Sequence, residues 1–548
     1  MPARDPLTIL PTHAVTNQPP PLEPYNLLDK DAALSEAVVR EGGSWAVDDL
    51  HAFGTLMGEP DTLELANRAN RHKPVLHSFN RYGQRIDEVE FHPAYHELMD
   101  IAIGNGIPSV AWTVKDNGHV VHTALEYLFA QIEGGVCCPL TMTYAAVPVL
   151  RRMPELADHW LPRILSGNYD QRMVPVEEKA GATIGMAMTE KQGGSDVRAN
   201  TTQATELEKE WYSLDGHKWF CSAPMSDAFL TLAQTEAGLT CFFVPRWRPD
   251  GQRNPFYVQR LKDKLGNWSN ASGEIEYNGT WGLKIGDEGR GVATIMEMVH
   301  HTRLDTSMAP AALMRQALVQ AIHHARHRTA FQKKLVDQPL MRRVLADLAI
   351  ESEAATVLLM RVARAYDDST HTPDRAGTAR LMVAVAKYWL NKCAPNFIYE
   401  AMECLGGVGY VEETIMPRLY REAPLNSIWE GSGNVICLDV LRTSQREPGA
   451  LDAVLADVGD AARDDNRIST GLDTLREMLR DKQDMEGNAR LMTERLAILI
   501  QGALMRRHAP GEMADAFLHT RLGGERGRTY GTIAGVDGGA ILERAWPT

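Results

Sequence analysis

Apolar residues recur every three to four positions over two long parts of the chain, a spacing that predicts amphipathic helices. The first part runs from residue 32 to about residue 163. The second contains long stretches at 340–358 and 376–405, which predict a helical bundle. Helical spacing then continues to about residue 505, beyond a predicted linker at 444–449.

Between residues 182 and 282 the pattern changes to short β-branched and aromatic runs separated by turns. Runs at 229–232 and 240–244 predict two strands, joined by a turn at 236–238. Helices and strands do not alternate along the chain, which argues against a doubly wound parallel sheet and a Rossmann dehydrogenase. The predicted fold class is therefore α+β.

These changes divide the 548 residues into an arm and four predicted domains. The proline-rich arm is either a loose tail or a strap across a neighbouring subunit. The predicted bounds are 1–31 for the arm, 32–181 for an N-terminal helical domain, 182–284 for a middle β domain, 285–445 for a C-terminal four-helix bundle and 446–548 for an extra helical domain.

The composition is that of a soluble globular protein, with 44% apolar and 23% charged residues. The net charge of −14 excludes a general basic field, so nucleic acid or anionic lipid would need a local basic patch. Seven cysteines without a C-x-x-C pair argue against a disulfide framework and predict a cytoplasmic protein. We find no signal peptide and no apolar run of about 18 residues, so no membrane partner is expected.

Three segments carry candidate chemistry. In the first, residues 186–197, the hydroxyls of Thr189 and Ser195 flank two glycines, so the backbone could approach a polar ring or a pyrophosphate. Taken alone, this segment is a plain turn. The second, residues 403–410, ends a helix with three glycines and taken alone is a helix C-cap.

The third segment, residues 426–434, places Glu430 directly after Trp429. Beside an indole the charged carboxylate would be poorly solvated, which raises its pKa and suits a general base. Taken alone, Glu430 is a surface-loop glutamate.

Together the three segments resemble the acyl-CoA dehydrogenase family. The first matches its flavin-loop signature, the second its other signature, and the third its catalytic segment. Residues 16–19 and 262–267 further resemble the AidB-like branch of the adaptive response to alkylation, which has an extra C-terminal helical domain. The signature positions are Ala187, Glu190, Gly194, Ser195, Asp196 and Ala199, then Glu403, Gly406, Gly407, Gly409, Glu413, Arg418 and Glu422.

The resemblance implies an FAD cofactor, an acyl-CoA or related thioester as substrate, and Glu430 as the base that removes the α-proton. It also implies a homotetramer, a dimer of dimers, in which Arg328 contacts the FAD pyrophosphate of a neighbouring subunit. The implied cofactor-binding residues are Met186, Ala187, Met188, Thr189, Gly194, Ser195, Phe220, Cys221, Ser222, Arg328, Glu403, Gly407, Trp429, Ser432 and Asn434. The implied substrate-pocket residues are Arg303, Trp429 and Arg442.

Three departures from the family pattern bear on activity. Trp429 replaces a tyrosine or smaller residue, Arg442 would point a cation towards an apolar pocket, and Phe331-Gln332 replaces Phe-Gly. Trp429, Arg442 and the extra domain favour an AidB-like flavoprotein with weak or residual dehydrogenase activity and DNA binding in the alkylation response. The alternatives are a fully active acyl-CoA dehydrogenase of fatty-acid or branched-chain catabolism, and a flavin-binding protein without catalysis.

The prediction of double-stranded DNA as a partner is based on the arginines of the last domain. Residues 451–548 carry 13 Lys and Arg against 16 Asp and Glu, which is not the balance of a basic DNA-binding domain. The predicted phosphate contacts are Arg506, Arg507, Arg521, Arg526 and Arg528; the alternative is a solvated surface paired with Glu512, Asp515 and Glu525.

No metal site is predicted from the histidines. His323, His324 and His327 lack a nearby carboxylate and fit a solvated helix face, and His300-His301 is similar.

Overall fold

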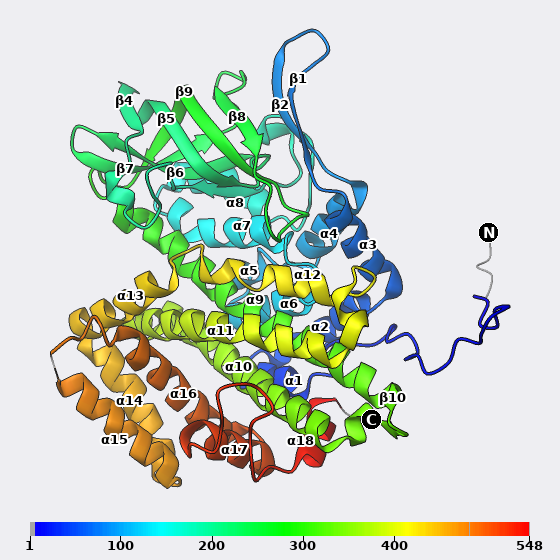
Figure 1. Ribbon diagram of the computed structural model, residues 1–548. Helices are drawn as coiled ribbons and strands as arrows, with labels where there is room; N and C mark the ends of the chain where they lie inside the picture. Colours follow the sequence, from blue (N-terminus) through cyan, green and yellow to red (C-terminus); the bar gives the residue numbers. More distant parts are fainter. Residues whose placement is uncertain (1–5, 482, 547–548) are drawn as a thin grey trace.

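The computed structural model describes residues 6–481 and 483–546, so the first five residues of the predicted arm lie outside the described part. A β domain lies at one end of the body and long helices run through its middle, with a further group of helices at the other end (Figure 1). The helix–strand–helix order and the α+β class are confirmed. No helix of the described residues is long and apolar enough to cross a membrane.

The N-terminal region is helical except for one hairpin. The hairpin consists of β1 (Val75–Phe79) and β2 (Arg85–Glu90), which pair antiparallel. This hairpin was not predicted, because its residues are mostly polar and exposed and form no apolar run. The helices are α1 (Ala32–Arg40), α2 (Val47–Met57), α3 (Pro60–Arg71), α4 (Pro93–Gly104), α5 (Val110–Thr113), α6 (Gly118–Ala130), α7 (Cys137–Leu150) and α8 (Pro154–Ile164).

The middle β domain is a sheet that closes on itself. Its order is β3-β6-β4-β5-β9-β7 with β8 on β9, and β7 also pairs with β6, which completes the ring. The two predicted strands form the β6–β7 hairpin and are confirmed. The strands are β3 (Ile184–Ala187), β4 (Gln203–Glu208), β5 (Trp211–Ser222), β6 (Ala228–Thr235), β7 (Gly238–Pro245), β8 (Phe256–Leu261) and β9 (Ser272–Ile285).

Long helices form the bundle, as predicted. α9 (Gly291–His327) packs against α7, α10 (Pro339–His371) and α11 (Ala376–Cys404). Between α9 and α10 lies a small hairpin, β10 (Thr329–Ala330) and β11 (Lys333–Lys334). α12 (Met416–Glu422) and α13 (Gly433–Arg446) complete this part of the chain.

The predicted linker at 444–449 is wrong. α13 continues to Arg446 and α14 begins at Pro448, because a proline is well placed in the first turn of a helix. α16 packs on both α10 and α11, and buried residues of this unit belong to the same core cluster as the bundle. The added helices are α14 (Pro448–Ala462), α15 (Asn466–Arg480), α16 (Ala489–His508), α17 (Gly511–Phe517) and α18 (Gly538–Ala545).

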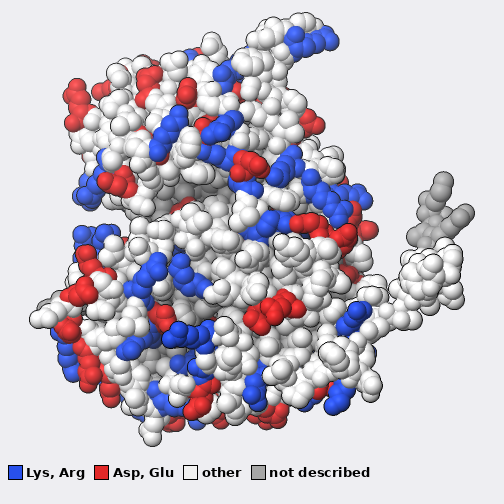
Figure 2. Space-filling model, viewed as in Figure 1, with Lys and Arg blue, Asp and Glu red and all other residues white. Residues whose placement is uncertain are grey.

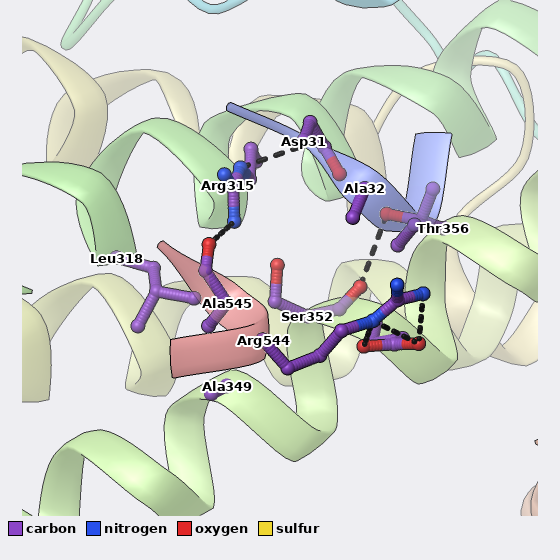
Figure 3. A pocket seen from close by; sticks show the side chains of 11 residues that line it. Asp31, Ala32, Arg315, Leu318, Ala349, Ser352, Thr356, Arg544 and Ala545 are labelled. Carbon is purple, nitrogen blue, oxygen red and sulfur yellow. Dashed lines mark hydrogen bonds and ion pairs between the residues drawn. The ribbon is translucent and has the colours of Figure 1, made fainter. Parts of the chain in front are cut away.

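A network of ion pairs ties the last helix to the first. Arg544 on α18 contacts Glu36 on α1 at 2.6 Å and Glu353 on α10 at 3.0 Å. Arg315 on α9 donates to the carbonyl of Ala545 at 2.8 Å, as Figure 3 shows around a cavity of about 10 Å³. The end of the extra helical unit is therefore fixed to the body.

The arm leaves the body near the end of α9. Residues 6–18 are exposed, and Figure 1 shows this part extending away from the rest of the chain. Asn17 then bonds the backbone of Thr329 at 2.8 Å, and His323 bonds the carbonyl of Pro20 at 2.9 Å. His323, predicted on a solvated face, thus lies against the arm.

Candidate active site

Glu430 lies in the short connection between a 3₁₀ turn at Leu425–Ser427 and α13. Its φ of 56° is in the left-handed region, and the next residue, Gly431, has φ 108°. A non-glycine residue in this conformation costs on the order of 1 kcal/mol and persists only where its surroundings enforce it. Such an outlier marks the loop as a functional candidate.

A buried lysine on α11 enforces the loop conformation. Lys387 Nζ donates to the carbonyl oxygens of Asn426 at 3.0 Å, Trp429 at 3.0 Å and Gly431 at 2.8 Å. Burial lowers the pKa of Lys387 to about 7, and the nearby Glu430 carboxylate counteracts that shift. The three acceptors surround Glu430 in sequence, so the lysine fixes the backbone on both sides of it.

Two residues of α9 complete the surroundings of Glu430. Thr302 Oγ1 donates to Glu430 Oε2 at 2.9 Å, and Arg303 Nε donates to the Glu430 carbonyl at 3.2 Å. The Arg303 guanidinium also pairs with Asp439 on α13 at 2.6 Å. Arg303, predicted in the substrate pocket, therefore lies at the site with its charge balanced by Asp439.

Burial raises the pKa of Glu430, although Thr302, Lys387 and Arg303 each lower it. The direction expected from the sequence is confirmed. Trp429 is partly buried against the core cluster to which α7, α8, α9 and part of the β domain contribute, and its indole donates to Asn426 at 2.7 Å. Trp429 therefore ties the Glu430 loop to that core.

The predicted flavin loop follows β3 and is anchored by Glu190. Although burial alone would raise its pKa, Lys218 at 2.8 Å holds the pKa of the Glu190 carboxyl well below its usual range. The loop presents Thr189 partly exposed and Ser195 exposed. A Cβ on Gly194 would lie 2.7 Å from Thr189 Oγ1, so a side chain at Gly194 would displace that hydroxyl.

The predicted cofactor residues at the end of β5 are Phe220, Cys221 and Ser222, and their side chains point alternately to the two faces of the strand. Phe220 is 48% exposed and Ser222 is partly exposed, whereas Cys221 is fully buried within the β-domain core. Ala187 is buried in the same core cluster. The predicted cofactor contacts of Cys221 and Ala187 could therefore come only from their backbone groups.

A second group of predicted cofactor residues lies far from Glu430 in this chain. Arg328 ends α9, 25 residues after Arg303, which corresponds to roughly 38 Å along a helix. Gly406, with φ 64°, ends the long helix that carries Glu403, and a Cβ on Gly407 would meet no atom within 4 Å. Figure 1 likewise places β10 and α13 at opposite ends of the bundle.

The remaining predicted residues lie on α13 or at its start. Ser432 precedes the helix and is partly exposed, and Asn434 accepts a bond from Arg490 of α16 at 2.8 Å. Arg442 is exposed on this helix, three residues after Asp439. Lys387, Thr302 and Asp439 were not predicted, since no local motif distinguishes a lysine, threonine or aspartate on a long helix.

The predicted DNA contact at Arg521 is wrong. Its guanidinium is only 2% exposed and pairs with Asp347 at 2.6 Å and Glu351 at 3.0 Å, both on α10. Neither carboxylate is among the partners expected for a solvated surface. Arg521 therefore joins the extra helical unit to the bundle and cannot reach a phosphate.

The other four arginines do not form a continuous basic surface. Arg507 pairs with Asp457 at 2.9 Å, and Arg526 approaches Glu351 at 3.7 Å. Arg506 and Arg528 are exposed. Figure 2 shows acidic and basic side chains interspersed over the helices at this end of the molecule.

The chain belongs to the acyl-CoA dehydrogenase family, as its fold and the comparisons below show. Residues 185–280 match the acyl-CoA dehydrogenase middle domain and residues 289–445 its C-terminal domain. Residues 17–171 match the N-terminal domain of the adaptive response protein AidB, which places the chain in the AidB-like branch. The AidB protein of Escherichia coli (strain K12) is 45% identical over 93% of this chain and 94% of its own length.

Two solved structures resemble the whole molecule. Caenorhabditis elegans ACDH-11 in complex with C11-CoA gives a TM-score of 0.83 at 26% identity and covers 100% of this chain and 95% of that one. The apo form of Bd2924 gives a TM-score of 0.80 at 28% identity and covers 90% of this chain and 99% of that one. Because the first similarity includes the residues after 445, the extra helical unit is part of a shared fold.

We expect the variant Lys387→Met to lower the free energy of unfolding by about 3 kcal/mol, because three buried carbonyl oxygens lose their donor while the apolar stem is kept. Denaturant unfolding followed by circular dichroism measures this change. Lys392→Met, on the same helix, is the matched control, since Lys392 donates to none of these carbonyls among the described residues. Equal destabilisation by the two substitutions would contradict the role of Lys387.

Proposed function

We propose that this protein is an FAD-binding oxidoreductase that dehydrogenates an acyl-CoA or a related thioester, with Glu430 as the catalytic base. The observation that carries the proposal is the Glu430 loop. A carboxylate with a raised pKa is held in a left-handed conformation by Lys387, Arg303 and Thr302. Strained backbone and buried cations persist in enzymes where the reaction requires one side chain to be held in a fixed position.

The residues present fit a flavin. The exposed ring of Phe220 and the partly exposed Ser222 offer an aromatic wall and a hydrogen-bonding hydroxyl on one strand face. Thr189 and Ser195 add hydroxyls from the adjacent loop, where Gly194 keeps the backbone bare. Bound FAD would supply the acceptor for the hydride that leaves the β-carbon of the substrate.

The protein's own residues orient the Glu430 carboxylate and set its pKa. Glu430 takes the α-proton on a carboxylate oxygen, while Thr302 fixes the other oxygen, Oε2, at 2.9 Å. Arg303 and Lys387 hold the backbone and favour the ionised form of the base. The C11-CoA complex of the ACDH-11 relative supports an acyl-CoA as the substrate class.

We propose that the activity is weak, because Trp429 fills part of the space in front of the base. Its indole is held by the hydrogen bond to Asn426 and packs against the neighbouring apolar core, so it cannot easily move aside. A fully active dehydrogenase of fatty-acid or branched-chain catabolism is the alternative. The rates in the experiment below decide between them.

Binding of double-stranded DNA through the arginines of the last domain is not part of the proposal. With Arg521 buried and Arg507 and Arg526 beside carboxylates, Arg506 and Arg528 supply about two phosphate contacts, fewer than the 6–10 that give strong DNA binding.

The test of the function is anaerobic reduction of the bound flavin by a panel of acyl-CoA thioesters. We expect the wild type to be yellow and to bleach slowly at about 450 nm, a general property of flavin reduction. Glu430→Gln should keep the cofactor and abolish bleaching, because it removes the base and keeps the shape. A colourless protein that FAD cannot reconstitute, or bleaching of the variant at the wild-type rate, would overturn the proposal.

A second variant tests how Thr302 affects the pKa of Glu430. In Thr302→Val the ionised carboxylate loses a donor, so the pKa of Glu430 should rise by roughly half a unit to one unit. Since the ionised form is the active one, the rise of kcat/KM with pH should move to higher pH by the same amount. Thr306→Val is the control, because Thr306 Oγ1 bonds the Arg303 carbonyl at 3.2 Å instead. An unshifted profile for Thr302→Val would exclude this role for Thr302.

We further propose that the cofactor site is shared between subunits of a homotetramer, since Arg328 and Gly407 lie far from Glu430 within one chain. The side chains of Phe331 and Tyr410, beside these residues, are 93% and 81% exposed. The exposed arm, with Leu7 and Ile9 at 81% and 79%, suits a strap on a second copy.

Sedimentation velocity tests this arrangement. We expect a wild-type tetramer, and a shift of Phe331→Ser towards smaller species together with loss of FAD. Tyr82→Ser, which changes an aromatic residue that is 70% exposed at the tip of the β1–β2 hairpin, should do neither. A monomeric wild type that binds FAD would contradict the shared site.

A further inference from the structure

Three metal-ligating side chains converge in the interior, outside the candidate active site. His122 and Glu126 lie one turn apart on α6, and Asp305 faces them from α9. Their relative exposures are 0%, 0% and 2%, and one ligand atom from each lies within 4.8 Å of the others. Neither the family signatures nor the proposed reaction uses these residues.

The imidazole is oriented as a metal ligand. His122 Nδ1 lies 2.6 Å from the carbonyl oxygen of Ile107. A carbonyl can only accept, so Nδ1 carries the proton and Nε2 offers its lone pair to the carboxylates. A histidine ligand of a metal usually has its second nitrogen bonded in this way. The ring of Tyr144 stacks on the imidazole at 3.8 Å and fixes its plane.

The carboxylates have oxygen atoms without hydrogen-bond partners. Glu126 Oε1 accepts from Thr141 at 3.0 Å, but no N–H or hydroxyl of the described residues donates to the buried Glu126 Oε2 or Asp305 Oδ2. A proton shared between the two carboxyl groups is the alternative to an ion. An unpaired buried carboxylate oxygen is costly, and two neighbouring carboxylates repel each other when both are ionised. A divalent cation between them would satisfy the oxygens and cancel the two negative charges.

The spacing fits a tetrahedral ion. His122 Nε2 lies 3.0 Å from Asp305 Oδ1 and 3.5 Å from Glu126 Oε2. Ligand atoms of a tetrahedral zinc site with bonds of 2.0–2.1 Å lie roughly 3.3–3.4 Å apart, so the three side chains can occupy three of its four corners after small shifts. We infer that His122, Glu126 and Asp305 form a structural site for a divalent transition-metal ion, with zinc as the best fit to one imidazole and two carboxylates.

The position of the site gives such an ion a structural role. Asp305 lies three residues after Thr302 on α9, so the ion would join α6 to the part of α9 that contacts Glu430. Its full burial leaves no room for a substrate. The ion would therefore brace the helix beneath the candidate active site and take no part in the reaction.

The experiment is a zinc determination on the full-length protein. Cells are grown with added zinc, loosely bound metal is removed by brief chelation, and zinc is measured by mass spectrometry. We expect about one zinc per chain in the wild type and loss of it in Glu126→Gln, which keeps the size of the side chain. His323→Gln/His327→Gln is the matched control, because these half-buried histidines with ring centroids 4.5 Å apart are a place for adventitious zinc. It should keep the metal.

Thermal unfolding with and without bound zinc gives a second readout. If the ion braces the helices, removing zinc lowers the unfolding midpoint of the wild type by several degrees, whereas the midpoint of Glu126→Gln does not depend on zinc. If the three groups only share hydrogen bonds, neither midpoint depends on zinc, although the substitution can destabilise the buried cluster by itself. Background zinc in the wild type, loss of zinc in the His323/His327 variant, or a wild-type midpoint that does not change when zinc is removed would each overturn the inference.

Discussion

The candidate active site depends on one buried ammonium group. Lys387 Nζ is the common donor for three carbonyls around Glu430, and these bonds offset the cost of holding that residue at φ 56°. Removing the ammonium from water is unfavourable, and burial accordingly lowers its pKa to about 7. Because Glu430 favours the charged lysine and the lysine favours the ionised glutamate, the loop geometry and the basicity of Glu430 are coupled.

The length of α9 fixes the distance between two groups of candidate site residues. This single helix carries Thr302 and Arg303 near its start and ends next to Arg328, roughly 38 Å from Arg303. A rigid helix keeps these residues apart whatever the loops do. Within one chain, Arg328 therefore cannot lie at the site that holds Glu430. The side chains of Phe331 and Tyr410 lie exposed beside the group that contains Arg328 and Gly407.

The sequence predicted elements whose signal is local. Helical spacing identified α10 and α11, and the β-branched runs identified β6 and β7. The β1–β2 hairpin was missed because it buries little and so has no apolar pattern. The position of Glu430 followed from a motif, but its partners Lys387 and Thr302 come from distant helices. Their roles arise only from packing, which spacing along one helix cannot reveal.

The arginines near the C-terminus show in the same way that the partners of a side chain cannot be read from the sequence. The arginines near the C-terminus suggested a phosphate-binding surface, yet Arg521 turns inward to two acidic residues of α10. Asp347 and Glu351 lie one turn apart on a helix face that would otherwise be apolar, so they need a cation from the unit that packs there. Arg544 on α18 does the same for Glu353, which lies on the same helix α10. The basic residues of the last unit thus compensate buried acids of the bundle, and the net charge of a segment gives no measure of what its arginines contact.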